Sequence, residues 1–200
     1  MIAPLVLAAG RGTRMGGLAK PLVEVGGVPA LARILAALQG ADLGEAIVVL
    51  GPEGDAVRAR IDLTGCQVVW NLTPERGLST SLAAGLAAVP DAALGVLVLH
   101  ADMPLIRATT LRAVAAAALK GASLAAPRHA GRRGFPVYIA RQHFSSLTAT
   151  LTGDEGARHY LEMHAGDLQL IDVDDAGCLF DFDRPEDLAQ EEILSWTTCV

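Results

Sequence analysis

Cysteine and basic residues are both scarce in this chain. Its three cysteines, Cys66, Cys178 and Cys199, are odd in number and show no CxxC spacing, which argues against a disulfide framework and against a zinc site. The chain has 16 Lys and Arg residues and 22 acidic residues, for a net charge of −6. It therefore has few residues that could form a basic surface for nucleic acid. We expect a protein of the reducing cytoplasm with no nucleic-acid partner.

Long hydrophobic runs are also missing, although 52% of the residues are hydrophobic and only 19% are charged. No stretch approaches the roughly 20 uninterrupted apolar residues that a membrane span needs. Residues 1–10 are apolar, but no positive region precedes them and the first arginine is Arg11, so we expect no export signal. The sequence predicts one compact, soluble domain over residues 1–200, without a membrane partner.

Strand-like and helix-like segments alternate along the first two thirds of the chain. Runs rich in Val, Ile and Leu predict strands that are buried on both faces; they cover residues 4–8, 46–50, 67–70, 95–99 and 123–126. Helix candidates lie between them at 29–39, 53–61, 79–89 and 108–119, with Pro29 as the first helical residue of one and Ser79 as the N-cap of another. This alternation predicts a mostly parallel sheet covered by helices on both faces.

Beyond Pro127 the pattern changes. A turn rich in Gly and Arg at 131–134 leads into a β-like run at 136–140, and a helical stretch at 154–164 precedes a second β-like run at 168–173. We interpret this part as an elaboration that closes over the sheet. A last helix is expected from residue 184 or 185 to residue 194.

A glycine-rich loop directly follows the first predicted strand. Its glycines let backbone N–H groups approach a phosphate chain, and basic side chains nearby add fixed positive charge, which together predict a cradle for a nucleoside triphosphate. The residues assigned to it are Leu7, Ala8, Ala9, Gly10, Arg11, Gly12, Thr13, Arg14 and Lys20. The spacing fits neither GxGxxG nor GxxxxGK followed by Ser or Thr, and a plain flexible loop is the structural alternative.

The segment LAAGRGTRMG at 7–16, followed by KPL at 20–22, resembles the signature loop of nucleotidyltransferases with the glycosyltransferase-A-like fold. Further segments resemble those of the molybdenum cofactor cytidylyltransferase family, in the same order. They are Asn71 with GLSTSL at 77–82, HADMP at 100–104, RGFPV at 133–137 with LTGDEGAR at 151–158, and DFDRPEDL at 181–188. The resemblance covers nearly the whole chain, and it implies an α/β fold, a single-domain three-layer Rossmann-like sandwich with a mostly parallel sheet.

The resemblance also implies a reaction. Members of that family move a CMP group from CTP to the phosphate of a molybdopterin-type acceptor and release pyrophosphate, and a molybdoenzyme or its chaperone is a further expected partner. The acceptor phosphate attacks the α-phosphorus directly, so positioning and charge neutralisation supply most of the catalysis. We expect Arg14, Lys20 and Asp102 to be the catalytic residues. Arg14 and Lys20, together with Arg11, are expected to hold the β- and γ-phosphates.

Two carboxylates are expected to hold a divalent cation. Asp102 follows the fourth predicted strand, at the edge where open α/β sheets place their ligands, and can hold Mg²⁺, or Mn²⁺ in its place, against the α-phosphate. The family usually has Gly-Asp-Met-Pro here, whereas this chain has Ala before the Asp and His100 before that, which is expected to narrow the space beside the metal. Either Asp181 or Asp183 supplies the second carboxylate; by resemblance we choose Asp181, and Asp183 then caps the last helix in a capping box with Glu186.

The nucleotide base is expected to lie against a helix N-terminus that offers hydroxyl and backbone N–H groups. The residues assigned to it are Asn71, Gly77, Ser79 and Ser81. Resemblance favours CTP, because cytidylyltransferases have Leu-Ala-Ala-Gly where the related guanylyltransferases have Leu-Ala-Gly-Gly, and this chain has Ala9 at the differing position. A methyl group there fills space beside a pyrimidine, whereas glycine leaves room for a purine. Arg132 and Arg133 are expected on the acceptor side.

Other functions stay open at this point. A related transferase could use GTP, or a sugar or polyol phosphate as acceptor, although the segments at 77–81 and 153–158 disfavour it. Relatives such as the nicotine blue oxidoreductases are NAD(P)H-dependent reductases of a heteroaromatic compound, and a non-catalytic cofactor chaperone is a third alternative. The basic cradle and Asp102 favour the transferase, because hydride transfer needs no Mg²⁺ carboxylate.

Overall fold

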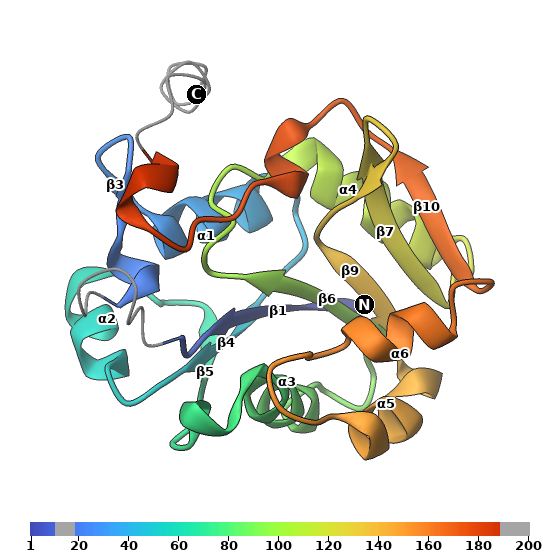
Figure 1. The fold of residues 1–200 in the computed structure, drawn as a ribbon, viewed down its shortest axis with the longest axis horizontal. Helices are drawn as coiled ribbons and strands as arrows, with labels where there is room; N and C mark the ends of the chain where they lie inside the picture. The colour runs from blue at the N-terminus through green and yellow to red at the C-terminus, as the bar shows by residue number, and fades with distance from the viewer. Residues whose placement is uncertain (11–18, 189–200) are drawn as a thin grey trace.

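A computed structural model describes residues 1–10 and 19–188 of the chain. In this part, eight strands form one sheet in the order β10-β7-β9-β6-β1-β4-β5, with β8 attached to β7 (Figure 1). The strands are β1 (Ile2–Ala8), β4 (Ala46–Leu50), β5 (Cys66–Trp70), β6 (Gly95–His100), β7 (Leu124–His129), β8 (Arg132–Arg133), β9 (Val137–Ala140) and β10 (Leu168–Asp172). A separate hairpin pairs β2 (Glu24–Val25) with β3 (Val28–Pro29).

The sheet is mostly parallel, as the apolar runs predict. β1 is parallel to β4 and β6, β4 is parallel to β5, and β7 is parallel to β10. The exceptions are β9, which runs antiparallel between β6 and β7, and the short β8. The expectation that residues 136–140 close over the sheet is therefore wrong, because β9 forms hydrogen bonds as a strand inside it.

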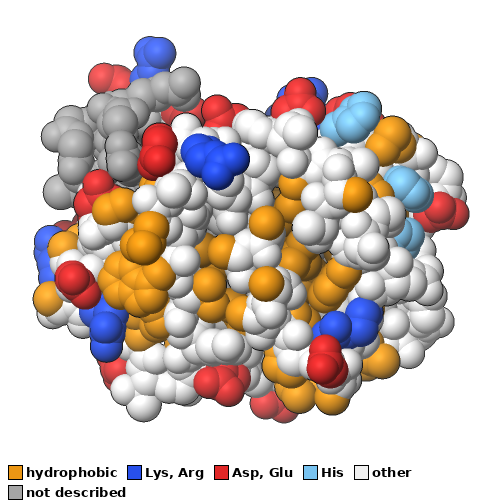
Figure 2. All heavy atoms as spheres, turned by 90° about the horizontal axis from the view of Figure 1, so that it is seen from below, with side chains coloured by type: hydrophobic (Ala, Val, Ile, Leu, Met, Phe, Trp, Pro, Cys, Tyr) orange, Lys and Arg blue, Asp and Glu red, His pale blue; other side chains and the backbone are white. Residues whose placement is uncertain are grey.

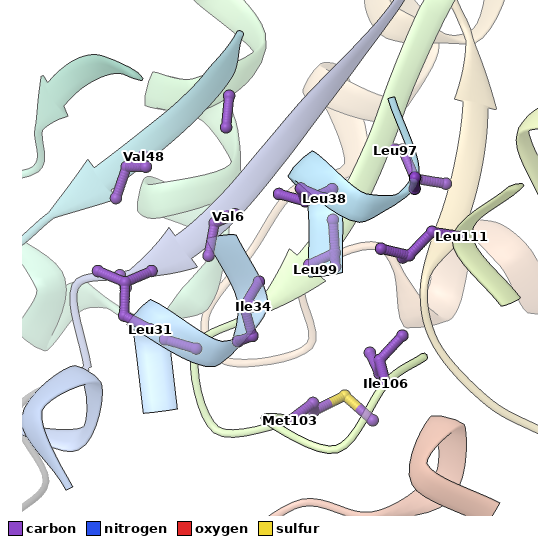
Figure 3. Close-up of a cluster of buried hydrophobic side chains, with 14 of the residues drawn as sticks. Val6, Leu31, Ile34, Leu38, Val48, Leu97, Leu99, Met103, Ile106 and Leu111 are labelled. Atoms are coloured by element: carbon purple, nitrogen blue, oxygen red, sulfur yellow. The ribbon is translucent and has the colours of Figure 1, made fainter. Parts of the chain in front are cut away.

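Helices cover both faces of the sheet, which confirms the three-layer α/β fold. On one face lie α1 (Ala30–Gly40), α2 (Gly54–Arg60) and α4 (Ala108–Leu119), and on the other lie α3 (Leu78–Ala87), α5 (Phe144–Thr150) and α6 (Arg158–Met163). Figure 3 shows Leu31, Ile34 and Leu38 of α1 directed at Val6 and Leu99 of the sheet, all at most 2% exposed. Burying such a side chain contributes about 1.5–3 kcal/mol, so packing of this face fixes where the strand ends lie.

Two differences from the predicted elements concern α5 and α6. No helix is predicted from the sequence over 144–150, where Ser and Thr lower the helix propensity. The helix expected at 154–164 begins only at Arg158, because Gly153 and Gly156 adopt φ values of 51° and 54°, which a right-handed helix does not accommodate. Within the described ranges, no helix is long and apolar enough to cross a membrane.

Helix starts also differ slightly from their predicted positions. Pro29 precedes α1 as its N-cap residue, and α3 has Gly77 as its N-cap, so the N-cap role expected for Ser79 is wrong. Short 3-10 turns occur at Lys20–Leu22, Pro74–Arg76, Arg141–His143, Ala176–Leu179 and Pro185–Leu188. The last of these occupies the start of the final predicted helix, of which residues 189–194 lie outside the described residues.

Candidate active site

The carboxyl ends of β1, β4 and β6 meet at one edge of the sheet, where parallel sheets place their ligands (Figure 1). β1 brings the buried residues Leu7, Ala8 and Ala9 to this edge, and Gly10 follows them in open space. The carbonyl oxygen of Ala9 lies so close to Gly51, after β4, that a Cβ on Gly51 would be 2.7 Å from it. The remaining loop residues assigned from the sequence, Arg11, Gly12, Thr13 and Arg14, lie outside the described residues.

The ammonium group of Lys20 joins two carboxylates at this edge. Its Nζ donates to Oδ2 of Asp102 at 2.8 Å and to Oδ1 of Asp183 at 2.6 Å. The Lys20 side chain is only 17% exposed, compared with 21% for Asp102 and 48% for Asp183. Burial opposes the charged form, but the carboxylates of Asp102 and Asp183 outweigh it and raise the pKa of Lys20. Segments far apart in the sequence thus share one cation.

Asp183 reaches this position because the chain beside it is anchored by Phe182. The N–H of Phe182 donates to the carbonyl oxygen of Asp102 at 3.2 Å. Its ring is fully buried in a small cluster that includes Val25 and Leu105. The last described segment is therefore tied both to the turn after β6 and to the β2–β3 hairpin.

The capping box expected from Asp183 and Glu186 is wrong. The carboxylate of Asp187, one residue further along, accepts from the backbone N–H groups of Asp183 and Arg184, both at 2.8 Å. These two hydrogen bonds lower the pKa of Asp187. Asp187 therefore stabilises the turn, while the side chain of Asp183 contacts Lys20.

Two further titratable side chains respond to this cluster. Burial, and then the charges of Asp102 and Asp183, raise the pKa of Asp181. Burial lowers the pKa of His100, while the charge of Asp102 acts in the opposite direction. The His100 ring also meets Phe135 edge to face, with centroids 4.7 Å apart. Among the described residues, three carboxylates thus lie around a single ammonium, so this described part of the site carries excess negative charge.

The oxygen donors of this cluster fit a hard divalent cation. Among the residues that the structure describes, no three His, Cys, Asp or Glu side chains are grouped around one metal position. Mg²⁺ in enzymes often takes only one or two carboxylates and keeps several waters, and Asp102 with Asp183 already holds one cation, the Lys20 ammonium. The contacts point to Asp183 as the partner of Asp102, whereas the sequence resemblance points to Asp181.

Two of the residues assigned to the base, Asn71 and Ser81, belong to a hydrogen-bonded network that also includes Thr73 and Thr80. Nδ2 of Asn71 donates to Thr80 Oγ1 at 2.8 Å and to Ser81 Oγ at 2.9 Å, and Oδ1 of Asn71 accepts from the N–H of Thr73 at 3.0 Å. Asn71, Ser79 and Ser81 are all buried. The amide of Asn71 is already hydrogen-bonded within the protein. We therefore interpret Asn71 as a residue that fixes the shape of the segment around Ser81, and its geometry does not favour direct contact with a base.

Exposed apolar side chains occur near this network. Figure 2 views the molecule from below, onto the side on which α3 and α5 lie in Figure 1. Hydrophobic side chains extend across the middle of this face, and charged side chains lie mostly toward its margin. At the carboxyl end of β5, Trp70 is 38% exposed and Leu72 is 72% exposed. Exposed apolar surface beside polar groups is typical of sites for organic ligands.

The expected acceptor-side arginines lie on the other half of the sheet. Arg132 and Arg133 form β8, and both are exposed. Arg133 lies opposite Arg128 of β7, which is held by two hydrogen bonds of 2.7 and 2.8 Å to the carboxylate of Asp172. Arg132 and Arg133 are thus available to solvent, in agreement with either an acceptor contact or a solvated hairpin tip.

The fold and the site together define a nucleotide-binding α/β protein, with a glycine-containing loop after β1 and a Lys and Asp cluster at the carboxyl edge of the sheet. The chain belongs to the family of the MobA-like NTP transferase domain, whose family model matches residues 4–169. This match confirms the nucleotidyltransferase superfamily that the motifs at 7–16 and 100–104 indicate.

Individual relatives carry different names. Nicotine blue oxidoreductase of Paenarthrobacter nicotinovorans is 30% identical over 191 residues, 92% of this chain and 93% of the relative. The bifunctional protein GlmU of Xanthobacter autotrophicus is 39% identical over 124 residues, 61% of this chain and 28% of GlmU. The chain spans only about a quarter of the length of the GlmU proteins that it matches.

Solved structures share the fold along almost the whole chain. Rv0371c of Mycobacterium tuberculosis superposes with a TM-score of 0.82 at 30% identity, over 94% of this chain and 96% of that one. A complex of Rv0371c with manganese superposes with a TM-score of 0.79 at 28% identity, over 100% and 99% of the two chains. A structure of similar fold has therefore been observed with a divalent metal ion.

Proposed function

We propose that this protein transfers a CMP group from CTP to the phosphate of a molybdopterin-type acceptor and releases pyrophosphate. The observation that carries the transferase assignment is the Lys20 ammonium, shared by Asp102 and Asp183 at the carboxyl edge of the sheet. The choice of CTP and of the acceptor is supported by motif resemblance, in particular LAAG at 7–10 and GDEGAR at 153–158.

In the proposed reaction, an oxygen of the acceptor phosphate bonds to the α-phosphorus of CTP, and the bond from that phosphorus to the bridging oxygen breaks as pyrophosphate leaves. Arg11, Arg14 and Lys20 bind the β- and γ-phosphates, so Lys20 exchanges its two carboxylate partners for phosphate oxygens when CTP enters. Asp102 and Asp181, with Asp183 as the alternative second ligand, would hold Mg²⁺ or Mn²⁺. When bound, that ion neutralises charge at the α-phosphate.

The preference for CTP over GTP is assigned to Ala9. This residue is 3% exposed and packs in the hydrophobic cluster on the α3 side of the sheet, with its carbonyl oxygen against Gly51. Glycine in this position would remove a packed methyl group and widen the range of backbone conformations. One methyl group is worth only about 1–3 kcal/mol of discrimination, so polar contacts must supply the rest.

Similarity to nicotine blue oxidoreductase over nearly the full length of both chains favours one second candidate, an NAD(P)H-dependent reductase of a heteroaromatic compound. The Lys20 and Asp102 cluster has no evident role in hydride transfer, and for that reason we rank this function second.

One assay separates these functions. The purified protein is incubated with Mg²⁺ or Mn²⁺, molybdopterin and, in turn, CTP, GTP, UTP or ATP, and pyrophosphate is measured. We expect acceptor-dependent pyrophosphate release that is at least about tenfold faster with CTP than with GTP. Release that requires a sugar or polyol phosphate would reassign the acceptor, and NAD(P)H oxidation with a heteroaromatic dye but no pyrophosphate would overturn the transferase.

A further inference from the structure

The segment GDEGAR at 153–158 covers most of the loop between α5 and α6 and the first residue of α6. The chemistry described so far assigns no role to its side chains. This loop lies directly against the start of α3. The N–H of Ser79 donates to the carbonyl oxygen of Gly153 at 3.0 Å, and the N–H of Leu78 donates to Oδ1 of Asp154 at 3.3 Å. Leu78 and Asp154 are 76 residues apart in the sequence. Gly153 and Asp154 are here called the α3 clamp.

Glycines on both sides make this contact close. Gly77 has φ +104°, and a Cβ there would overlap the carbonyl group of Gly153 and lie 2.8 Å from the backbone nitrogen of Asp154. On the other side, Gly156 has φ +54°, and a Cβ there would lie 2.9 Å from Cδ2 of Leu78. Both positions therefore favour glycine for conformation and for space. The close contact between the loop and α3 therefore depends on glycines from two motifs that lie far apart in the sequence, GLSTSL at 77–82 and GDEGAR at 153–158.

The loop is itself held from both ends. Tyr160 of α6 has its hydroxyl 2.8 Å from Nδ1 of His143 and 2.7 Å from Oγ of Ser146. The ring of His164 stacks on Tyr160 with centroids 4.1 Å apart. His143 and Ser146 lie before the loop and Tyr160 lies after it, so these contacts limit how far the α3 clamp can move from α3.

The clamp also accepts hydrogen bonds from the first N–H groups of α3. A helix N-terminus attracts anions because its first N–H groups lack partners within the helix. Here the N–H groups of Leu78 and Ser79 already have partners, and the N–H of Thr80 donates to the carbonyl oxygen of Gly77. On the other side of the segment, the amide of Asn71 holds Thr80. The start of α3 is thus fixed from two directions before any ligand binds.

We propose that Asp154 and Gly153 are positioning residues of the nucleotide site: they hold the segment from Gly77 to Ser81 in the shape that accepts the nucleoside part of the substrate, without touching it themselves. This inference rests on the proposed function, because it assigns the base-side segment to nucleotide binding. A preorganised segment saves the ordering cost that a loose one pays on binding. Loss of the clamp therefore weakens nucleotide binding more than it slows the chemical step.

The test uses three variants of the full-length protein. Asp154→Ala removes the acceptor for the Leu78 N–H, Asp154→Asn keeps an oxygen acceptor, and Glu155→Ala removes a neighbouring exposed carboxylate of the same charge. Equilibrium binding of CTP is measured by calorimetry, and hydrogen exchange at the Leu78 and Ser79 amides is followed without nucleotide. We expect Asp154→Ala to weaken CTP binding about fivefold, the size of a lost helix cap, and to speed exchange at these two amides.

The controls decide the interpretation. Asp154→Asn is expected to restore most of the affinity, Glu155→Ala is expected to match the wild type, and kcat at saturating CTP is expected to change little in all three. Equal CTP affinities for wild type and Asp154→Ala would overturn the positioning role while leaving the proposed function intact. A wild-type protein that binds none of the four nucleotides would overturn both, and unchanged amide exchange in Asp154→Ala would show that the clamp does not hold α3.

Discussion

Replacement of Lys20 by methionine tests the ion cluster without any substrate. Methionine preserves much of the length of the side chain but leaves Asp102, Asp181 and Asp183 without the ammonium that two of them contact. The pKa of Asp181 is already raised, by burial and by the charges of the other two carboxylates. We therefore expect Lys20→Met to destabilise the protein at neutral pH and to make its stability more dependent on a divalent cation.

The size of the effect follows from the exposure of the two ion pairs. A hydrogen bond between charged groups contributes about 1.5–3 kcal/mol when it is shielded, and a solvated pair contributes about 0–1 kcal/mol. The contact to Asp102, between side chains 17% and 21% exposed, belongs near the first range, and the contact to Asp183, which is 48% exposed, belongs near the second. Together they predict a loss of about 2–3 kcal/mol, or a Tm lower by about 4–12 °C.

The pH dependence has a defined sign. The pKa of Lys20 is raised in the folded state. The stability that the Lys20 ammonium provides is therefore not reduced by its own deprotonation below the pKa of about 10.4 in the unfolded state, and it is lost as the pH rises through the pKa of Lys20 in the folded state. The difference in stability between wild type and Lys20→Met is expected to shrink in acid as well, as the carboxylates that the ammonium balances become protonated.

The assay is thermal unfolding followed by circular dichroism, with EDTA and with Mg²⁺. The matched control is Lys120→Met, at the other lysine of the chain, whose side chain is exposed after α4; it should unfold within about 2 °C of the wild type. Mg²⁺ is expected to restore part of the Tm of Lys20→Met and to change the control little. An unchanged Tm for Lys20→Met in EDTA, or an equal response to Mg²⁺ in both variants, would show that the Lys20 ammonium does not stabilise the carboxylate cluster.

Three other substitutions give separate tests. Asp102→Asn is expected to reduce pyrophosphate release by about two to three orders of magnitude with only a modest loss of Tm, because the amide can still accept from Lys20; normal release would remove Asp102 from the site. Burial, and then the charge of His164, lower the pKa of His143, so wild-type stability in urea should fall as the pH drops below about 6.5. His143→Gln should reduce that dependence, to which the lowered pKa of His100 also contributes; an unchanged slope would show that His143 does not cause it. Ala9→Gly should reduce the CTP to GTP rate ratio about five- to tenfold, the lower part of the range for one methyl group, without reversing it; a constant ratio would exclude Ala9 from base selection.

The parallel half of the fold can be predicted from the sequence, because β1, β4 and β6 are unbroken apolar runs and the helices between them have helical length. The place of β9 cannot be predicted in this way. A four-residue run carries no information about its partner strand, and its pairing with β6 depends on Gly95, where a Cβ would overlap the carbonyl oxygen of Ile139. Close packing of this kind is a tertiary property.

The site is predictable only in part for the same reason. Lys20 and Asp102 are identified from the glycine loop and the strand end, and the structure brings them into contact. The segment 181–188 has several acids, and their spacing alone does not say which one meets Lys20. The buried ring of Phe182 decides it, because it anchors the chain so that Asp183 reaches Lys20 and Asp187 closes the following turn.

The most direct test of the proposed metal and phosphate site is a crystal structure of the protein with CTP and Mn²⁺, with the metal located by its anomalous scattering. We expect an anomalous peak about 2.1 Å from a carboxylate oxygen of Asp102, with a second carboxylate from Asp181 or Asp183, and Lys20 moved onto the phosphates. A metal bound away from Asp102, or a Lys20 that still joins Asp102 to Asp183 while CTP is bound, would contradict it.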